Sequence, residues 1–336
     1  MRGIVAACAM LVIILDTKIA TTSATEGVVL CIRTIIPSLF PFFVLAGVIN
    51  SSLLGQNIRP LHPLCRLCKI PKGTESLLIL GFLAGYPVGA QLIAQAYNSK
   101  KLSKRMAHRM LGFCNNPGPA FLFGILTPLF TSVKVIWILW SILIISALIT
   151  GYILPSEETT PAAISIHTGT SFSESLQKSI RITAGVCGWV ILFRVIIGFC
   201  NRWFLWLFPQ AVQILFIGLL ELSNGSVLLQ SVNNECTRFL LAVFILAFGG
   251  LCVAMQTVSV TEGLGTGWYF PGKILQSIIS ILLALLIQTF LFPRGEQMTD
   301  ATTVGIIIAV LIIMAVPFGT KLKKTVAFQR KVVYNR

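Results

Sequence analysis

The sequence predicts an all-α polytopic membrane protein with about eight spanning helices and two re-entrant hairpins arranged as inverted repeats. Composition is the first reason. Of the 336 residues, 55% are hydrophobic and only 11% are charged, whereas soluble domains carry about 25% charged residues. The second reason is a series of nearly uncharged apolar runs, each close to the roughly 20 residues that a spanning helix needs. The third is the order in which Gly, Pro and Asn interrupt these runs.

The apolar segments are expected at 3–20, 34–50, 76–97, 110–130, 134–154, 182–200, 210–231, 238–258, 274–293 and 301–319. No soluble domain fits between them. The longest polar gap, 155–181, is rich in Ser and Thr, and its prolines end the preceding helix. The predicted units are an N-terminal membrane helix (1–30), a first repeat (31–155), a linker (156–181), a second, inverted repeat (182–295), and a C-terminal helix with a basic cytoplasmic tail (296–336).

The N-terminal segment has a basic start, an apolar stretch and small residues after it. This pattern is shared by a cleaved signal peptide and by an uncleaved first helix. We expect the uncleaved helix, because everything after it is membrane-embedded. Both interpretations place the N-terminus inside.

Basic residues outnumber acidic ones by 26 to 11, for a formal net charge of +15. They gather in the loops 55–72 and 98–109 and in the tail 321–336. Short basic loops beside membrane segments mark the cytoplasmic face. No basic–aromatic module accompanies the charge, so nucleic acid is not an expected partner.

Nine cysteines are scattered along the chain, several within apolar runs, where a free Cys behaves as a small hydrophobe. His62, Cys65 and Cys68 in "HPLCRLC" are candidate metal ligands by residue type. A structural zinc site needs four ligands, and no fourth is spaced nearby. We expect no metal site and interpret the segment as a reduced cytoplasmic loop.

The two halves share one pattern. Four segments of the first half have counterparts of the same order in the second half, by pattern and not by residue identity. The second segment of each half is interrupted by turn residues, and the third by a Gly-rich break. The interruptions are "GYPVG" at 85–89, "SNG" at 223–225, "NNPGP" at 115–119 and "GG" at 249–250.

Topology favours hairpins for the second segments. If 76–97 spanned the bilayer, the basic loops on either side of it would face opposite compartments, against the positive-inside rule. If 76–97 returns at "GYPVG", both loops are cytoplasmic, and each arm of about 14 Å reaches roughly the midplane. With 210–231 as the matching hairpin, each half makes an odd number of crossings, so the halves are inverted. Such repeats point to a transporter with a midplane site.

The broken segments supply polar groups at membrane depth. Pro117 and Pro119 lack N–H groups, Gly118 frees the backbone, and Asn115 and Asn116 offer neutral donors and acceptors. Half-helix N-termini suit a carboxylate or phosphate. Plain kinks are the alternative, because Pro and Gly are common in membrane helices. The recurrence of such breaks favours a ligand or ion site.

Two charged residues lie within apolar segments. Glu221 precedes the second apex, where it could carry a coupling proton or bind the solute, and Arg194 could neutralise it or bind a carboxylate. Snorkelling to the outer interface is an equal alternative for Arg194. Gln256 is a further polar group expected at the site. No nucleophile–base pair, metal constellation or cofactor motif is present in the sequence, so we expect no catalytic residue and no enzyme.

Several motifs resemble the sporulation integral membrane protein YlbJ family, in the wider group with nucleoside-recognition Gate domains. They are "PSLFPFFVLAGVI" at 37–49, "GFLAGYPVGAQLIAQAY" at 81–97, "LGFCNNPGPAFLFG" at 111–124, "LLELSNG" at 219–225 and "FGGLCVAMQ" at 248–256. The motif positions carried over as substrate-binding are Gly85, Tyr86, Pro87, Asn115, Asn116, Pro117, Gly118, Pro119, Glu221, Asn224, Gly225, Gly249, Gly250 and Gln256.

The resemblance implies a bacterial multi-pass membrane protein that moves a small anionic solute in spore formation, with dipicolinate exported from the mother cell across the outer forespore membrane. A proton or cation is the expected coupling partner, and a homo-oligomer is left open. Two alternatives stay open: a non-transporting membrane component of spore envelope assembly, and a nucleoside or base transporter.

Overall fold

The computed structural model describes residues 2–54, 56, 58–156, 171–292, 305 and 307. Within these residues every regular element is helical, which confirms the all-α architecture. The α-helices before the interhalf gap are α1 (Arg2–Leu15), α2 (Thr17–Leu30), α3 (Ile36–Leu53), α4 (His62–Leu67), α5 (Glu75–Leu83), α6 (Val88–Asn98), α7 (Lys104–Leu111), α8 (Pro119–Leu126) and α9 (Val133–Ile153). Those after it are α10 (Phe172–Trp203), α11 (Gln210–Leu220), α12 (Leu222–Leu228), α13 (Glu235–Phe248), α14 (Gly250–Val260) and α15 (Tyr269–Leu291).

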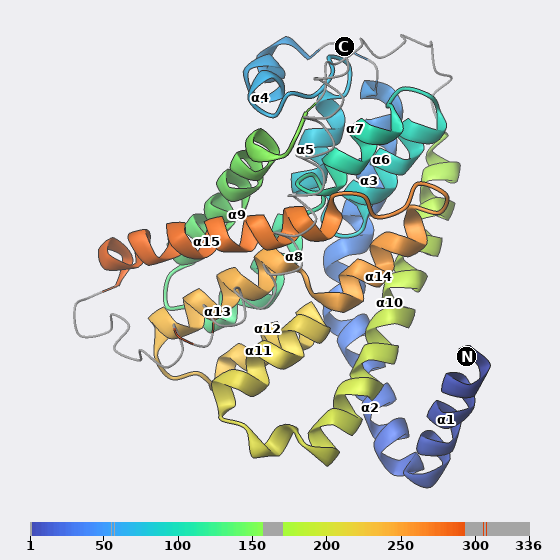
Figure 1. Cartoon of the computed structure of the whole chain (residues 1–336), viewed down its shortest axis with the longest axis vertical. Coiled ribbons are helices and arrows are strands. Elements are labelled where there is room, and N and C mark those ends of the chain that lie inside the picture. Colours follow the sequence, from blue (N-terminus) through green and yellow to red (C-terminus); the bar gives the residue numbers. More distant parts are fainter. Residues whose placement is uncertain are drawn as a thin grey trace, which may run out of the picture.

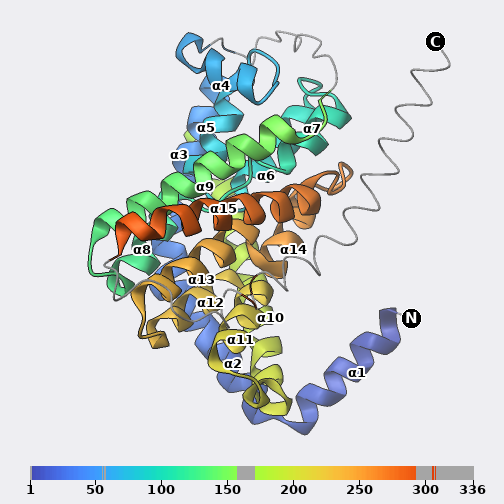
Figure 2. The ribbon, with the colours of Figure 1, turned by 60° about the vertical axis from the view of Figure 1, so that its left-hand side comes forward.

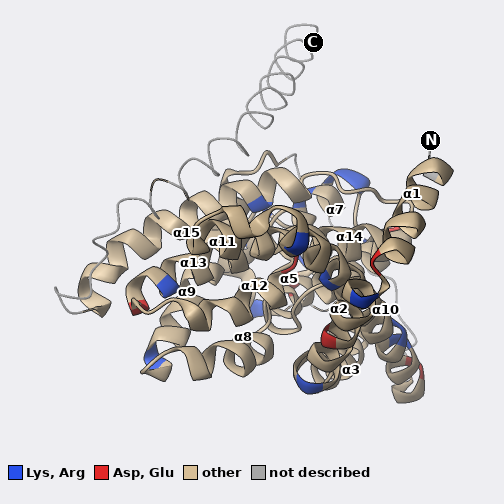
Figure 3. Cartoon of the chain, turned by 90° about the horizontal axis from the view of Figure 1, so that it is seen from below, with Lys and Arg blue, Asp and Glu red and all other residues tan. Residues whose placement is uncertain are grey.

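Five helical stretches in the described residues are long and apolar enough to cross a membrane: Thr17–Leu53, Val133–Ile153, Phe172–Trp203, Glu235–Val260 and Tyr269–Leu291. Charged side chains are sparse on these helices (Figure 3). The count of eight crossings and the inverted repeats stay predictions. The expected C-terminal helix at 301–319 and the basic tail lie outside the described residues, apart from helical positions 305 and 307.

The longest helices run side by side. The π-helical turn Cys31–Ile35 joins α2 to α3 into one continuous rod, and α10 packs along that rod (Figure 1). The expected segment 3–20 is not one helix, because the chain breaks at Asp16. The Asp16 side chain accepts a hydrogen bond from the backbone N–H of Ile19 and so caps α2. Helix α1 stands apart from the bundle (Figure 2).

The segment 76–97 folds back on itself. Helices α5 and α6 pack against each other around the turn at Ala84–Pro87, whose Tyr86–Pro87 peptide bond is cis. The basic loops on either side therefore meet at one end of the molecule, the upper end in Figure 1. The buried Arg109 guanidinium donates to the Cys68 carbonyl at 2.6 Å, and the Lys101 ammonium donates to the Leu54 carbonyl at 3.0 Å.

The second hairpin differs from the sequence expectation in its apex. The chain breaks at Glu221, between α11 and α12, and Ser223, Asn224 and Gly225 lie inside α12 rather than at a turn. The expected linker is also shorter than predicted, because α10 already begins at Phe172, capped by Ser171. The third segment of each half breaks as expected. In the first half the break lies between α7 and α8, and in the second half it lies at Gly249, between α13 and α14. Short 3-10 turns lie at Arg59–Leu61, Thr127–Leu129, Leu205–Leu207 and Leu229–Ser231.

Candidate functional site

The broken segments of both halves enclose a small cavity of about 30 Å³. The turn between α5 and α6 and the coil before α8 line it from the first half; the break at Glu221 and helix α14 line it from the second. Helices α3 and α10 complete the wall. The predicted site residues that line the cavity are Tyr86, Pro117, Gly118, Glu221 and Gln256. Five of the predicted site residues therefore lie around one cavity, and their role in binding a solute stays a prediction.

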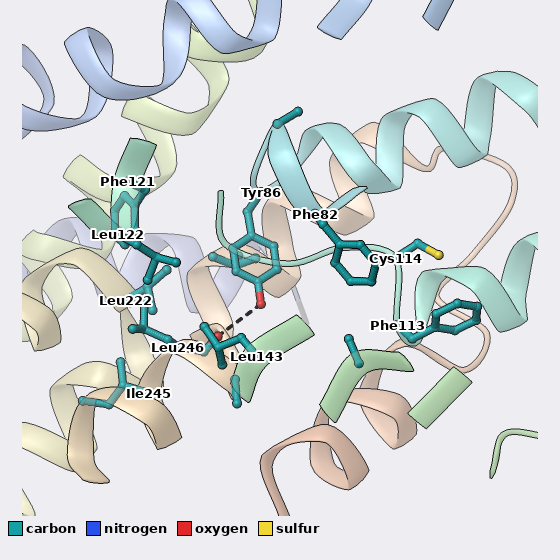
Figure 4. Packing of buried hydrophobic residues seen from close by; sticks show 14 of the residues in the cluster. Phe82, Tyr86, Phe113, Cys114, Phe121, Leu122, Leu143, Leu222, Ile245 and Leu246 are labelled. Carbon is teal, nitrogen blue, oxygen red and sulfur yellow. Dashed lines mark hydrogen bonds between the residues drawn. The ribbon is translucent and has the colours of Figure 1, made fainter. Parts of the chain in front are cut away.

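Tyr86 lies where the turn between α5 and α6, the coil before α8 and the break at Gly249 meet. It is buried, and its hydroxyl points toward the Leu246 carbonyl at 3.4 Å (Figure 4). Gly85 and Gly249 both have a φ of +85°, which favours glycine. A Cβ on Gly249 would lie 3.0 Å from the Tyr86 hydroxyl, and a Cβ on Gly85 would lie 3.0 Å from the Gly118 nitrogen. These glycines therefore let the hairpin turn and the two broken helices approach one another.

Behind Tyr86 lies a buried lysine that the sequence analysis missed. Lys273, in the first turns of α15, is 0% exposed. Its ammonium donates to the Tyr86 hydroxyl at 3.0 Å, to Asn116 Oδ1 at 3.1 Å and to Gln276 Oε1 at 2.9 Å. It also lies 5.0 Å from the centre of the Tyr86 ring. One sequence signal could have found it: Lys273 is the only Lys or Arg between Arg238 and Arg294.

The two asparagines have different partners. Asn116 Oδ1 accepts from both Lys273 and Gln276 Nε2, the latter at 2.8 Å. Asn115 Oδ1 accepts from the backbone N–H of Ala90 at 3.3 Å, and its Nδ2 donates to Thr257 Oγ1 at 3.1 Å. Asn115 therefore ties the first turn of α6 to α14, whereas Asn116 belongs to the lysine network.

Glu221 is held by its own helix. Its carboxylate accepts from the backbone N–H of Ser223 at 3.0 Å, and from the backbone N–H and side-chain Nδ2 of Asn224 at 2.7 Å each. Glu221 thus caps α12 and is 1% exposed. Asn224 and Gly225 do not line the cavity. Asn224 supports the cap, and Gly225 packs closely on Gly218 of α11.

Arg194 does not join this site. Its guanidinium pairs with the Glu26 carboxylate on α2 instead of with Glu221, so the expected neutralising pair is wrong. The partner lies 168 residues earlier in the chain, where no local pattern could indicate it. Gln256 does reach the cavity, and its Nε2 contacts Cys252 Sγ at 3.4 Å. Gly250, Pro87 and Pro119 shape the backbone next to the cavity without lining it.

The cysteines of the loop 55–72 point inward. Cys65 and Cys68 are buried, and Cys68 Sγ lies 3.9 Å from the Leu148 carbonyl. Burial raises the pKa of the Cys65 thiol to about 12, with a further contribution from the Glu75 carboxylate, and raises that of Cys68 to about 11. Nearby, His62 Nε2 lies 3.6 Å from the buried Glu75 carboxylate.

The site therefore combines one buried ammonium, neutral amide and hydroxyl groups, and one capped carboxylate, all inside a bundle of membrane-length helices. Such a bundle defines a multi-pass integral membrane protein. Comparison with known proteins agrees. The chain is similar to the sporulation integral membrane protein YlbJ of Bacillus subtilis (strain 168), with 22% identity and with 79% of this chain and 76% of that protein covered. This similarity confirms the resemblance drawn from the motifs. No family model matches the chain, and no solved structure does.

Proposed function

We propose that the protein transports a small anionic solute across a membrane during spore formation, with dipicolinate as the candidate solute. The setting is supported by the similarity to a sporulation integral membrane protein. The transport activity is supported by broken helices that bring polar groups and a cavity into the middle of apolar segments. The outer forespore membrane is the compartment that this proposal implies.

The buried ammonium of Lys273 is the reason for proposing an anion as the solute. All three of its hydrogen-bond acceptors are neutral oxygens, and within the described residues it forms no ion pair with a carboxylate. A charge inside the membrane is costly unless it is paired. An anion in the adjoining cavity would supply the missing partner charge, with the Tyr86 hydroxyl between the two.

The cavity is small for the proposed solute. A volume of about 30 Å³ is about that of one water molecule, so a dicarboxylate needs the surrounding elements to move. On this proposal, transport therefore requires the hairpin turns to separate from α3 and α10.

Glu221 is the proposed site of the coupling proton. It lines the same cavity as Tyr86 and comes from the other half of the chain. Its oxygens accept three hydrogen bonds from groups within its own helix, and it has no cationic partner in the described residues. Protonation during anion binding would remove the repulsion between two negative charges in one small chamber.

The alternatives make different predictions. Amide groups such as Gln256 could bind a neutral nucleoside or base, but a neutral solute would leave the Lys273 charge uncompensated. A non-transporting component of envelope assembly would need no opening of the cavity. Both alternatives predict that an anion gradient has no effect on the protein.

Purified full-length protein in liposomes tests the proposal. We expect uptake of radiolabelled dipicolinate above that of empty liposomes, competition by unlabelled dipicolinate, and no competition by uridine or hypoxanthine. Spores that lack the gene should contain less dipicolinate, and external dipicolinate should restore the content. Uptake equal to empty liposomes together with normal spore content would reject the transporter, and competition by uridine would favour the nucleoside alternative.

A further inference from the structure

A second, larger cleft opens beside the first hairpin. It has a volume of about 200 Å³ and lies between α3, α6 and α10. Leu54 at the end of α3 and Ser99 at the end of α6 line it. The Leu54 carbonyl also accepts from Lys101 of a basic loop. The cleft therefore lies at the end of the molecule that carries the basic loops, away from the Glu221 hairpin.

The lining of the cleft combines apolar side chains with hydrogen-bonding groups. Three amides and four hydroxyls contribute to it: Asn50, Gln91, Gln95, Ser51, Ser99, Ser175 and Ser179. Lys178 is the one charged residue of the lining, and none of the lining residues is Asp or Glu. Neutral hydrogen-bond donors with one ammonium and no carboxylate suit a carboxylate-bearing solute.

Asn50 indicates that the cleft is built for a ligand. Its side chain is 5% exposed, and among the described residues its Oδ1 has no hydrogen-bond partner. A buried polar atom without a partner costs free energy. This oxygen is an acceptor that faces a cleft with room for about seven waters by volume, so a water or another hydrogen-bond donor bound in the cleft can satisfy it.

The cleft and the cavity follow one another along the same two rods of helix. On the rod formed by α2, the π-helical turn and α3, Ile35 and Leu39 line the cavity, and the residues one, two and three turns beyond Leu39 on the same face line the cleft. On α10, Val186 and Val190 line the cavity, while Ser175, Ser179 and Ile182 of the same face line the cleft. Apolar side chains of Phe43, Ile182 and Val88 lie between the two spaces, and Phe43 is 2% exposed.

We propose that this cleft is a second solute-binding site, an antechamber in which the small carboxylate binds before or after the central cavity. The inference rests on the proposed function for the identity of the solute. The Gln95 amide donates to the carboxylate, and a water bound with the solute donates to Asn50 Oδ1. Lys178 supplies charge at the mouth, and Phe43 with Ile182 separates the antechamber from the cavity. Lys178 is held at 2.7 Å by Glu174, and both side chains are about half exposed, so the pair can exchange partners.

Equilibrium binding of radiolabelled dipicolinate to the purified full chain tests the antechamber. We expect two sites per chain. Gln95→Leu should weaken one of them about tenfold or more and leave the other unchanged. Glu174→Gln, which frees Lys178, should tighten that same site. Ser52→Ala, on the exposed side of α3, is the control and should change neither site.

The outcomes separate this inference from the proposed function. One site that is lost in Lys273→Met and unchanged in Gln95→Leu would overturn the antechamber and leave the transporter standing. One site that is lost in Gln95→Leu and unchanged in Lys273→Met would support the antechamber and reject the role of Lys273. No binding to the wild type would overturn the antechamber, and liposome uptake would then decide the transporter separately. Because Asn50→Leu could fail to fold, the half-buried Gln95 carries the test.

Discussion

The ammonium of Lys273 lies 3.0 Å from the phenolic oxygen of Tyr86, although the two residues are 187 positions apart. Tyr86 is carried by the turn between α5 and α6, and Lys273 by the membrane-length helix α15. The contact joins the first hairpin to the last helix of the second half. It also places a positive charge directly behind the wall of the central cavity.

Tyr86→Phe should weaken solute binding by about tenfold or more, because a hydrogen bond to a charged group is worth about 1.5–3 kcal/mol. The ring remains and keeps its packing against the glycine breaks, so the protein should insert normally. Tyr97→Phe, on the same hairpin but outside both solute spaces, is the matched control. Dipicolinate binding to both purified variants measures the difference, and equal loss in the two would contradict the role of the hydroxyl.

Asn115 and Asn116 should behave differently when each is replaced by Ala. Asn116→Ala removes an acceptor that the buried Lys273 and Gln276 share, so stability should fall and uptake should fall about tenfold or more. Asn115→Ala breaks the link between α6 and α14 and leaves buried partners unsatisfied, at a cost of about 1–3 kcal/mol, with a smaller effect on uptake. Thermal melting and uptake of both variants, compared at equal amounts of folded protein, separate these effects. Uptake that is lost in Asn115→Ala and kept in Asn116→Ala would reverse the assignment.

Glu221→Ala should destabilise the second hairpin by about 0.5–2 kcal/mol, the usual cost of losing an N-cap. Glu221→Gln keeps an accepting oxygen, so it should retain binding and lose the dependence of uptake on pH. Adding Arg194→Gln should not rescue either variant, because Arg194 pairs with Glu26 and distant sites act independently. Recovery of pH-dependent uptake in the double variant would show that the two residues interact after all.

Thiol alkylation should report the inward packing of the loop 55–72. The raised pKa values keep Cys65 and Cys68 protonated at neutral pH, and the thiolate is the reactive form. Iodoacetamide should therefore modify Cys65 slowly at pH 7 and faster as the pH rises toward about 12. Mass spectrometry of the labelled peptides measures both rates. A rate for Cys65 at pH 7 equal to that in the denatured protein would mean that the loop is open.

Strongly patterned parts of the fold were predictable from the sequence. The expected helix at 134–154 became Val133–Ile153, because an uncharged apolar run follows a Ser N-cap. The turn at "GYPVG" and the break at "GG" were found because Gly and Pro there oppose a helix. The same reasoning misplaced the second apex, since Asn and Gly in "SNG" are tolerated within α12 once Glu221 caps it.

The polar contacts of the site were harder to predict from the sequence than the helices. Lys273 was overlooked because it stands at the edge of an apolar run, where a loop lysine and a buried lysine look alike. The options for Arg194 were pairing with Glu221, binding a solute carboxylate and snorkelling, and none of them named Glu26, because that partner is set by the packing of α10 on α2. Periodicity indicates which face of a helix is apolar, but it does not indicate which distant polar group that face meets.

Dipicolinate uptake by liposomes containing Lys273→Met tests the central claim most directly. Met has a similar length and no charge, and the relief of the desolvated ammonium should offset the loss of its three hydrogen bonds, so the fold should remain intact. The matched control is Lys134→Met, because Lys134 is exposed in the first turn of α9. We expect uptake to fall at least tenfold in Lys273→Met, with normal protein level and melting temperature, and to stay unchanged in Lys134→Met. Wild-type uptake by a well-folded Lys273→Met protein would contradict the proposal that this lysine draws the anion into the site.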